Sequence, residues 1–137
     1  MACPFFFPTE RLASSLWPHP SRLPLGAGWN GRCTSAAASA SPTEDELKHG
    51  CNLGYARGCP HLPKERSADA VRFGVLRDRD GRITLQYSLE RAYGPAGHGM
   101  IEYDDRARAW LNRHEEDIRI QRMAECYLES YLLRRRT

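Results

Sequence analysis

The sequence has no run of about 18 apolar residues, so a membrane-spanning helix is not expected. Charge of one sign is also scarce. Its 20 basic and 17 acidic side chains leave a net charge of +3, too small to require a nucleic acid or an anionic membrane as partner. The five cysteines are too few for a disulfide-dense scaffold, and their odd number argues against a fully paired set. What remains is a soluble globular composition over 137 residues, enough for one domain.

Residues 1–43 differ in composition from the rest of the chain. They hold six of the nine prolines but only four charged residues, and 34–41 contains only Thr, Ser and Ala. No helical or strand period runs through them, so we expect a disordered low-complexity extension. An organelle transit peptide and a start site assigned too far upstream are alternative origins for this extension. The protein is therefore expected in the cytoplasm, with targeting to an organelle through 1–43 as the alternative.

Residues 44–137 are expected to form a single small α+β domain. Thr43 and Glu46 have the spacing of a capping box, which predicts a short helix over 44–49. Turn-forming glycines and prolines dominate 51–68, so this segment is predicted to be a loop.

Alternation of apolar and polar residues predicts two strands, over 71–75 and 83–90. Asp80-Gly81 between them is typical of a hairpin turn, because these residue types tolerate positive φ. A third, shorter strand is predicted over 99–103. The expected sheet is a two- to three-stranded antiparallel meander.

The last third of the chain is predicted to be helical and to pack against this meander. Asp104 or Asp105 is expected to cap one helix, which would carry Ala107 and Trp110 on its apolar face. Asp117 is expected to cap a second helix, whose apolar residues follow helical spacing as far as Tyr131.

One short segment combines two cysteines with two histidines. It has the order His-x-Cys, seven residues and then Cys-x-His. Thiolate and imidazole together favour zinc, and four such ligands complete a structural site. The seven-residue gap departs from the usual Cys-x₂₋₄-Cys spacing. The leading hypothesis is a non-catalytic protein with a structural zinc ion held by His49, Cys51, Cys59 and His61.

Alternative roles for the cysteines remain open. Four thiolates for an iron–sulfur cluster would come from Cys33, Cys51, Cys59 and Cys126, although the usual iron–sulfur spacings are absent. Cys126 could also add a ligand to the zinc site, or be a buried structural cysteine. A redox-responsive bridge between Cys51 and Cys59 is a further alternative.

A module without any metal is the main alternative to these sites. The free edge of the meander, or the aromatic face of Tyr127 and Tyr131, would then contact a partner protein or a second copy. No catalytic motif is complete: His114 begins like a metalloprotease helix, but Ile118 occupies the position of the second histidine. The glycine-rich stretch 94–99 lacks a phosphate-binding ending and is predicted to be a loop.

Overall fold

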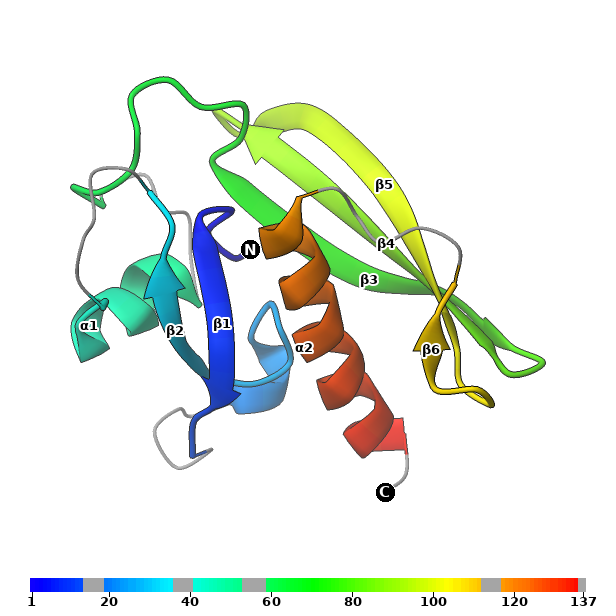
Figure 1. Cartoon of the computed structure of the whole chain (residues 1–137). Helices are drawn as coiled ribbons and strands as arrows, with labels where there is room; N and C mark the ends of the chain where they lie inside the picture. The colour runs from blue at the N-terminus through cyan, green and yellow to red at the C-terminus, as the bar shows by residue number, and fades with distance from the viewer. Residues whose placement is uncertain (14–18, 36–40, 53–58, 112–116, 136–137) are drawn as a thin grey trace.

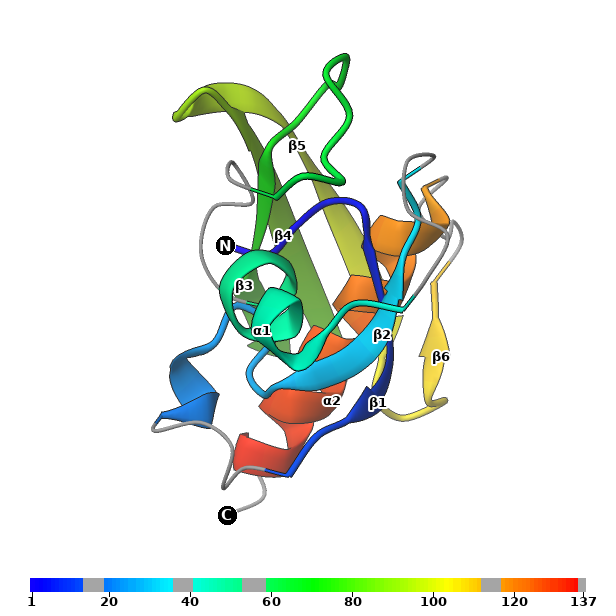
Figure 2. The same cartoon turned by 90° about the vertical axis from the view of Figure 1, so that its left-hand side faces the viewer.

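The computed structural model describes residues 1–13, 19–35, 41–52, 59–111 and 117–135. The predicted α+β class is confirmed, since antiparallel sheets combine with a C-terminal helix. The helix α2 (Ile118–Arg135) lies between a four-stranded sheet and a two-stranded sheet, as Figures 1 and 2 show. Within the described residues, no helix combines the length and the apolar character that spanning a bilayer would require.

The larger sheet is an antiparallel meander. Its strands, in spatial order, are β3 (Ala70–Arg79), β4 (Arg82–Arg91), β5 (Gly94–Asp104) and β6 (Ala109–Trp110). The predicted hairpin between β3 and β4 is confirmed, since Asp80 and Gly81 have φ values of 56° and 79°. The apolar residues of this sheet and of α2, among them Leu85, Ile101 and Met123, belong to one core.

The prediction of a loop at 94–99 is wrong. This glycine-rich segment is the first half of β5 and pairs with β4. Gly99 lies opposite Tyr87, and a Cβ atom at Gly99 would come within 2.4 Å of the Tyr87 hydroxyl oxygen. The absence of a side chain at Gly99 therefore makes room for the Tyr87 ring. The glycine-rich composition of 94–99 did not reveal this pairing.

The predicted helix beginning at Asp104 or Asp105 is also wrong. The Asp104 carboxylate accepts hydrogen bonds from the backbone N–H groups of Arg106 and Ala107, at 2.9 and 3.1 Å. These bonds form a tight turn, with Arg108 at φ 54°, and the chain returns as β6. An aspartate side chain can stabilise a turn or a helix start by the same local bonds, so the sequence signal was ambiguous.

The second predicted C-terminal helix is confirmed as α2. Asp117 precedes it, and its carboxylate accepts a 2.9 Å hydrogen bond from the backbone N–H of Arg119. The segment 112–116, which includes His114, lies outside the described residues.

The capping box at Thr43 and Glu46 is confirmed at the start of α1 (Glu44–Glu46). The chain continues as a π-helical turn, η3 (Leu47–Cys51), in which the N–H of Asn52 donates to the Leu47 carbonyl at 3.0 Å. Such turns are rare and often occur at functional sites.

Much of the segment expected to be disordered has regular structure. The strands β1 (Phe6–Arg11) and β2 (Trp29–Cys33) form the two-stranded sheet, and η2 (Pro20–Arg22) is a short 3₁₀ turn. Phe6, Leu25 and Trp29 are at most 2% exposed and belong to the same core as α2 and the larger sheet. Segments 14–18 and 36–40 lie outside the described residues.

Candidate metal centre

A cavity of about 240 Å³ lies beside β1, β2 and η3, which are neighbours in Figure 2. Four cysteines line this four-thiol cavity: Cys3, Cys33, Cys51 and Cys59. They come from four separate segments: the residues before β1, the end of β2, the end of η3 and the stretch before β3. His61, Glu46 and the apolar ring of Phe6 also line the cavity.

Backbone pairing holds these segments together. The N–H of Cys3 donates to the Cys51 carbonyl at 3.1 Å. Cys33 lies opposite Phe6 in the β1–β2 sheet, and the Phe6 N–H donates back to the Cys3 carbonyl at 3.1 Å. The hydroxyl of Ser35 donates to the carbonyl of His61, which links the end of β2 to the segment of Cys59.

Asn52 fixes the π-helical turn against β2. Its side-chain oxygen accepts from the Trp29 N–H at 3.0 Å, and its amide nitrogen donates to the carbonyls of Trp29 and Leu47 at 2.8 and 3.2 Å. Asn52 is only 1% exposed, so these bonds are shielded from water. This buried hydrogen-bond network therefore also holds the preceding residue, Cys51, in place.

The thiols of Cys3 and Cys51 ionise with difficulty. Burial raises the pKa of Cys3 to about 11 and that of Cys51 to about 12. Cys33 and Cys59 contribute to both shifts, because a neighbouring thiolate would repel a second negative charge. Both thiols are protonated at neutral pH, so a metal that binds them must displace their protons.

The structure brings together only part of the ligand set predicted from the sequence. Cys51, Cys59 and His61 line the four-thiol cavity, but His49 does not. The His49 side chain is 72% exposed and lies 3.5 Å from the Asp45 carboxylate. The predicted grouping of both histidines with both cysteines is therefore not present in the structure.

His61 lies at the cavity but is engaged with a carboxylate. Its Nε2 atom is 3.1 Å from Glu46. Cys126 is buried in α2 outside the cavity, and its charged neighbours are Arg11, Arg122, Glu125 and Glu129. Burial raises the pKa of Cys126 to about 12, which fits a structural cysteine.

Sequence reasoning did not place Cys3 at this cavity and did not group it with Cys33. Both lie in the segment expected to be disordered, and only the β1–β2 pairing brings them to the cavity. The four thiols border the cavity, and across the described ranges no three His, Cys, Asp or Glu side chains meet as ligands of one ion. All five cysteines are free thiols in the structure.

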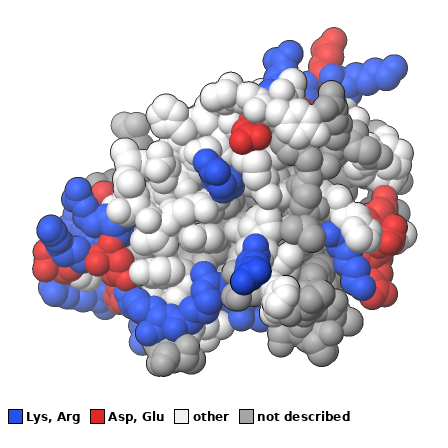
Figure 3. Space-filling view, turned by 180° about the vertical axis from the view of Figure 1, so that it is seen from behind, with Lys and Arg blue, Asp and Glu red and all other residues white. Residues whose placement is uncertain are grey.

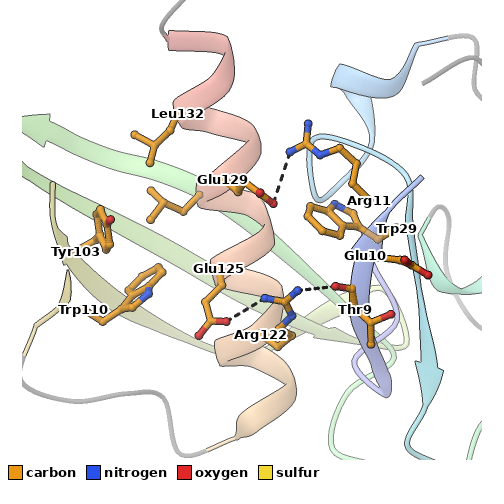
Figure 4. Close-up of a pocket in the computed structure, with 11 residues that line it drawn as sticks. Thr9, Glu10, Arg11, Trp29, Tyr103, Trp110, Arg122, Glu125, Glu129 and Leu132 are labelled. Atoms are coloured by element: carbon orange, nitrogen blue, oxygen red, sulfur yellow. Dashed lines mark hydrogen bonds and ion pairs between the residues drawn. The ribbon is translucent and has the colours of Figure 1, made fainter. Parts of the chain in front are cut away.

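A second hollow, of about 470 Å³, lies between β1, α2 and β6 (Figure 4). In this hollow Arg122 donates to the Thr9 carbonyl at 2.8 Å and pairs with Glu125 at 3.2 Å. Arg11 lies 3.8 Å from Glu129. These contacts hold β1 against α2.

The aromatic face predicted to meet a partner contacts the larger sheet. Tyr127 stacks on Phe73 with ring centroids 5.9 Å apart, and the Tyr131 hydroxyl donates to Asp78 at 2.6 Å. Figure 3 shows a face with few charged side chains at its centre. A protein partner or a second copy stays a prediction.

Comparisons of the chain with protein-family models, with curated proteins and with solved structures found no match.

Proposed function

We propose that this protein holds a structural metal centre in the four-thiol cavity. The observation that carries the proposal is that four cysteines, spread over residues 3–59, line one cavity. Thiolates are the ligands preferred by zinc and by iron–sulfur groups. The hydrogen bond between the backbones of Cys3 and Cys51 supports the proposal, because it holds these two cysteines beside the same cavity.

The chemistry of the site favours a structural role over a catalytic one. Four protein ligands leave no open position on a zinc ion for water or substrate. The raised pKa values of Cys3 and Cys51 also make these thiols poor nucleophiles. A bound metal would join the residues before β1 to β2, η3 and the segment of Cys59, and its binding energy would add to the stability of the fold.

The proposal modifies the zinc hypothesis drawn from the sequence. It keeps Cys51 and Cys59 and replaces the two histidines with Cys3 and Cys33. The exposure of His49 and the contact of His61 with Glu46 support this exchange. Zinc remains one candidate metal for the four thiolates.

We place the protein in the cytoplasm as part of the same proposal, because thiols stay reduced there and available to metal. Removal of 1–43 as a transit peptide would take away Cys3 and Cys33, so the metal centre requires a chain that keeps both. The intact mass of protein recovered from fractionated cells tests this part. A cytoplasmic species that retains Cys3 and Cys33 is expected, and a shortened organellar species would contradict it.

Elemental analysis of protein purified anaerobically without chelator tests the metal centre. We expect a fixed ratio of zinc or iron to protein, which single alanine substitutions at Cys3, Cys33, Cys51 and Cys59 reduce. Cys126→Ala and His49→Ala are matched controls, since both residues lie outside the cavity, and both should retain the metal. A folded protein without metal would disprove the proposal, as would metal loss in Cys126→Ala but not in Cys3→Ala.

A further inference from the structure

The size of the four-thiol cavity bears on which metal group it holds. Zinc lies about 2.3 Å from each thiolate, so the four sulfurs of a zinc site are within roughly 4 Å of one another and enclose no further space. The cavity here measures about 240 Å³. A single water molecule needs roughly 10–15 Å³ of such space. The cavity is therefore much larger than a single zinc ion needs.

The arrangement of the thiols also indicates a group larger than a single zinc ion. They border one cavity from four places in the chain: before β1, at the end of β2, at the end of η3 and before β3. Such an arrangement suits a group with several metal atoms that binds each cysteine at a different point. Iron–sulfur clusters are held in this way by four cysteine thiolates.

The surroundings of the cavity suit a group that needs protection from water. Cys3 and Cys51 are 7% and 8% exposed, and Phe6 beside them is 1% exposed. Burial stabilises an iron–sulfur cluster and is one of the factors that set its potential. The contact of His61 with Glu46 leaves the four thiols as the ligand set.

We infer that the four-thiol cavity binds an iron–sulfur cluster and not a single zinc ion. This inference rests on the metal centre proposed above and names the group that it contains. Insertion of a preformed cluster is a ligand exchange. Each cysteine sulfur bonds to one iron and its proton passes to the small thiolate that leaves, so no atom changes its oxidation state.

The test uses the full chain, purified anaerobically and then mixed with a synthetic four-iron, four-sulfide cluster that carries four simple thiolates. We expect the purified protein to contain iron and acid-labile sulfide in equal amounts, or to acquire them from this probe. A broad visible absorption that stays with the protein through gel filtration is the spectroscopic signature. Single zinc ions bound by the same four cysteines would overturn the inference but leave the proposed metal centre standing. Absence of any bound metal from the folded protein, before and after mixing, would overturn both.

Variants separate the two ligand sets. The Cys3→Ser protein should lose most or all of its iron and sulfide, whereas the His61→Ala and Cys126→Ala proteins should keep both in full. The zinc site predicted from the sequence requires the opposite order, because it uses His61 and not Cys3. If Cys3→Ser does not fold, the half-buried Cys33 provides the same comparison, because it also belongs to the four-thiol set and not to the zinc site predicted from the sequence. Retention of the full cluster in Cys33→Ser and in Cys59→Ser would overturn the inference.

Discussion

The backbone N–H of Cys3 donates a 3.1 Å hydrogen bond to the carbonyl of Cys51. One residue earlier, Ala2 exchanges two hydrogen bonds with Val71 of β3, at 2.8 and 2.9 Å. Residues 2 and 3 therefore connect the π-helical turn to the edge of the larger sheet. Both are buried, so the start of the chain belongs to the core and positions one of the four thiols.

Ala2→Glu should destabilise the protein by more than about 2 kcal/mol, because it places a carboxylate at a position that is only 1% exposed. Displacement of Ala2 should also weaken metal retention, since Cys3 follows it. Ala107→Glu is the matched control, because Ala107 is exposed in the turn before β6, and its effect should stay within about 0.5 kcal/mol. Urea unfolding measures both. Equal unfolding midpoints for the two variants would show that Ala2 is not packed in solution.

Gly31→Ala tests whether the β1–β2 sheet is folded in solution. A Cβ atom at Gly31 would lie 2.3 Å from the Phe7 carbonyl oxygen and 2.8 Å from the Pro8 Cα, so the backbone would have to move. We expect a loss of about 1–3 kcal/mol in the free energy of unfolding. Gly74→Ala is the control, because a Cβ there meets nothing within 4 Å. A neutral Gly31→Ala would favour the disordered extension predicted from the sequence.

The features predicted correctly depend on local chemistry. The capping box of Thr43 and Glu46 and the hairpin at Asp80-Gly81 each need only residues within a few positions of one another. The alternation of apolar and polar residues in β4 is also local, and its first apolar residues, Ile83 and Leu85, are buried. These local elements are sufficient to predict the α+β class without knowledge of the long-range pairing.

The small sheet was missed because its signals are long-range or unusual. Pro8 argued against a strand, but it lies next to a shift in register, where a proline interrupts little pairing. The segments of Phe6 and Trp29 are far apart in the sequence, so neither shows that it is buried by the other. Cys3 was missed for the same reason, whereas Cys33 was grouped with Cys51 and Cys59 in the iron–sulfur alternative. The apolar run Cys3-Pro4-Phe5-Phe6 was the one local hint, because cysteine and phenylalanine are among the most buried residue types.

Asn52→Ala should be among the most damaging polar substitutions in the chain. It removes the side-chain partner of the Trp29 N–H and of the Trp29 carbonyl, whereas the Leu47 carbonyl keeps its bond from the backbone N–H of residue 52. We expect a loss of about 2–4 kcal/mol in the free energy of unfolding. Asn30→Ala is the control, because Asn30 is in the same strand but its amide donates to Glu10 in an exposed position. Similar losses in the two variants would contradict the role given to the Asn52 network.

The contribution of Asp78 to stability should depend on pH. The hydrogen bond from the Tyr131 hydroxyl, at 2.6 Å, and the contact with Arg135, at 2.9 Å, lower the pKa of this carboxyl. Because the pKa is lower in the folded than in the unfolded protein, the stabilisation is complete above the unfolded value of about 3.9 and disappears as the pH falls through the folded value. Wild type should thus exceed Asp78→Asn in stability by up to about 1 kcal/mol at neutral pH, with the gap closing in acid.

Parallel urea titrations between pH 7 and pH 2.5 measure this gap. Tyr131→Phe provides the matched comparison, because it removes the strongest hydrogen bond to Asp78 and leaves Arg135 in place. In the Tyr131→Phe background the pKa of Asp78 is less depressed. Asp78→Asn should therefore lower the free energy of unfolding by a smaller amount, and this loss should vary less with pH. High salt should reduce the part that comes from Arg135, because charges near the surface are screened. A gap that stays constant from pH 7 to pH 2.5 would show that Asp78 stabilises the fold by packing and not by its charge.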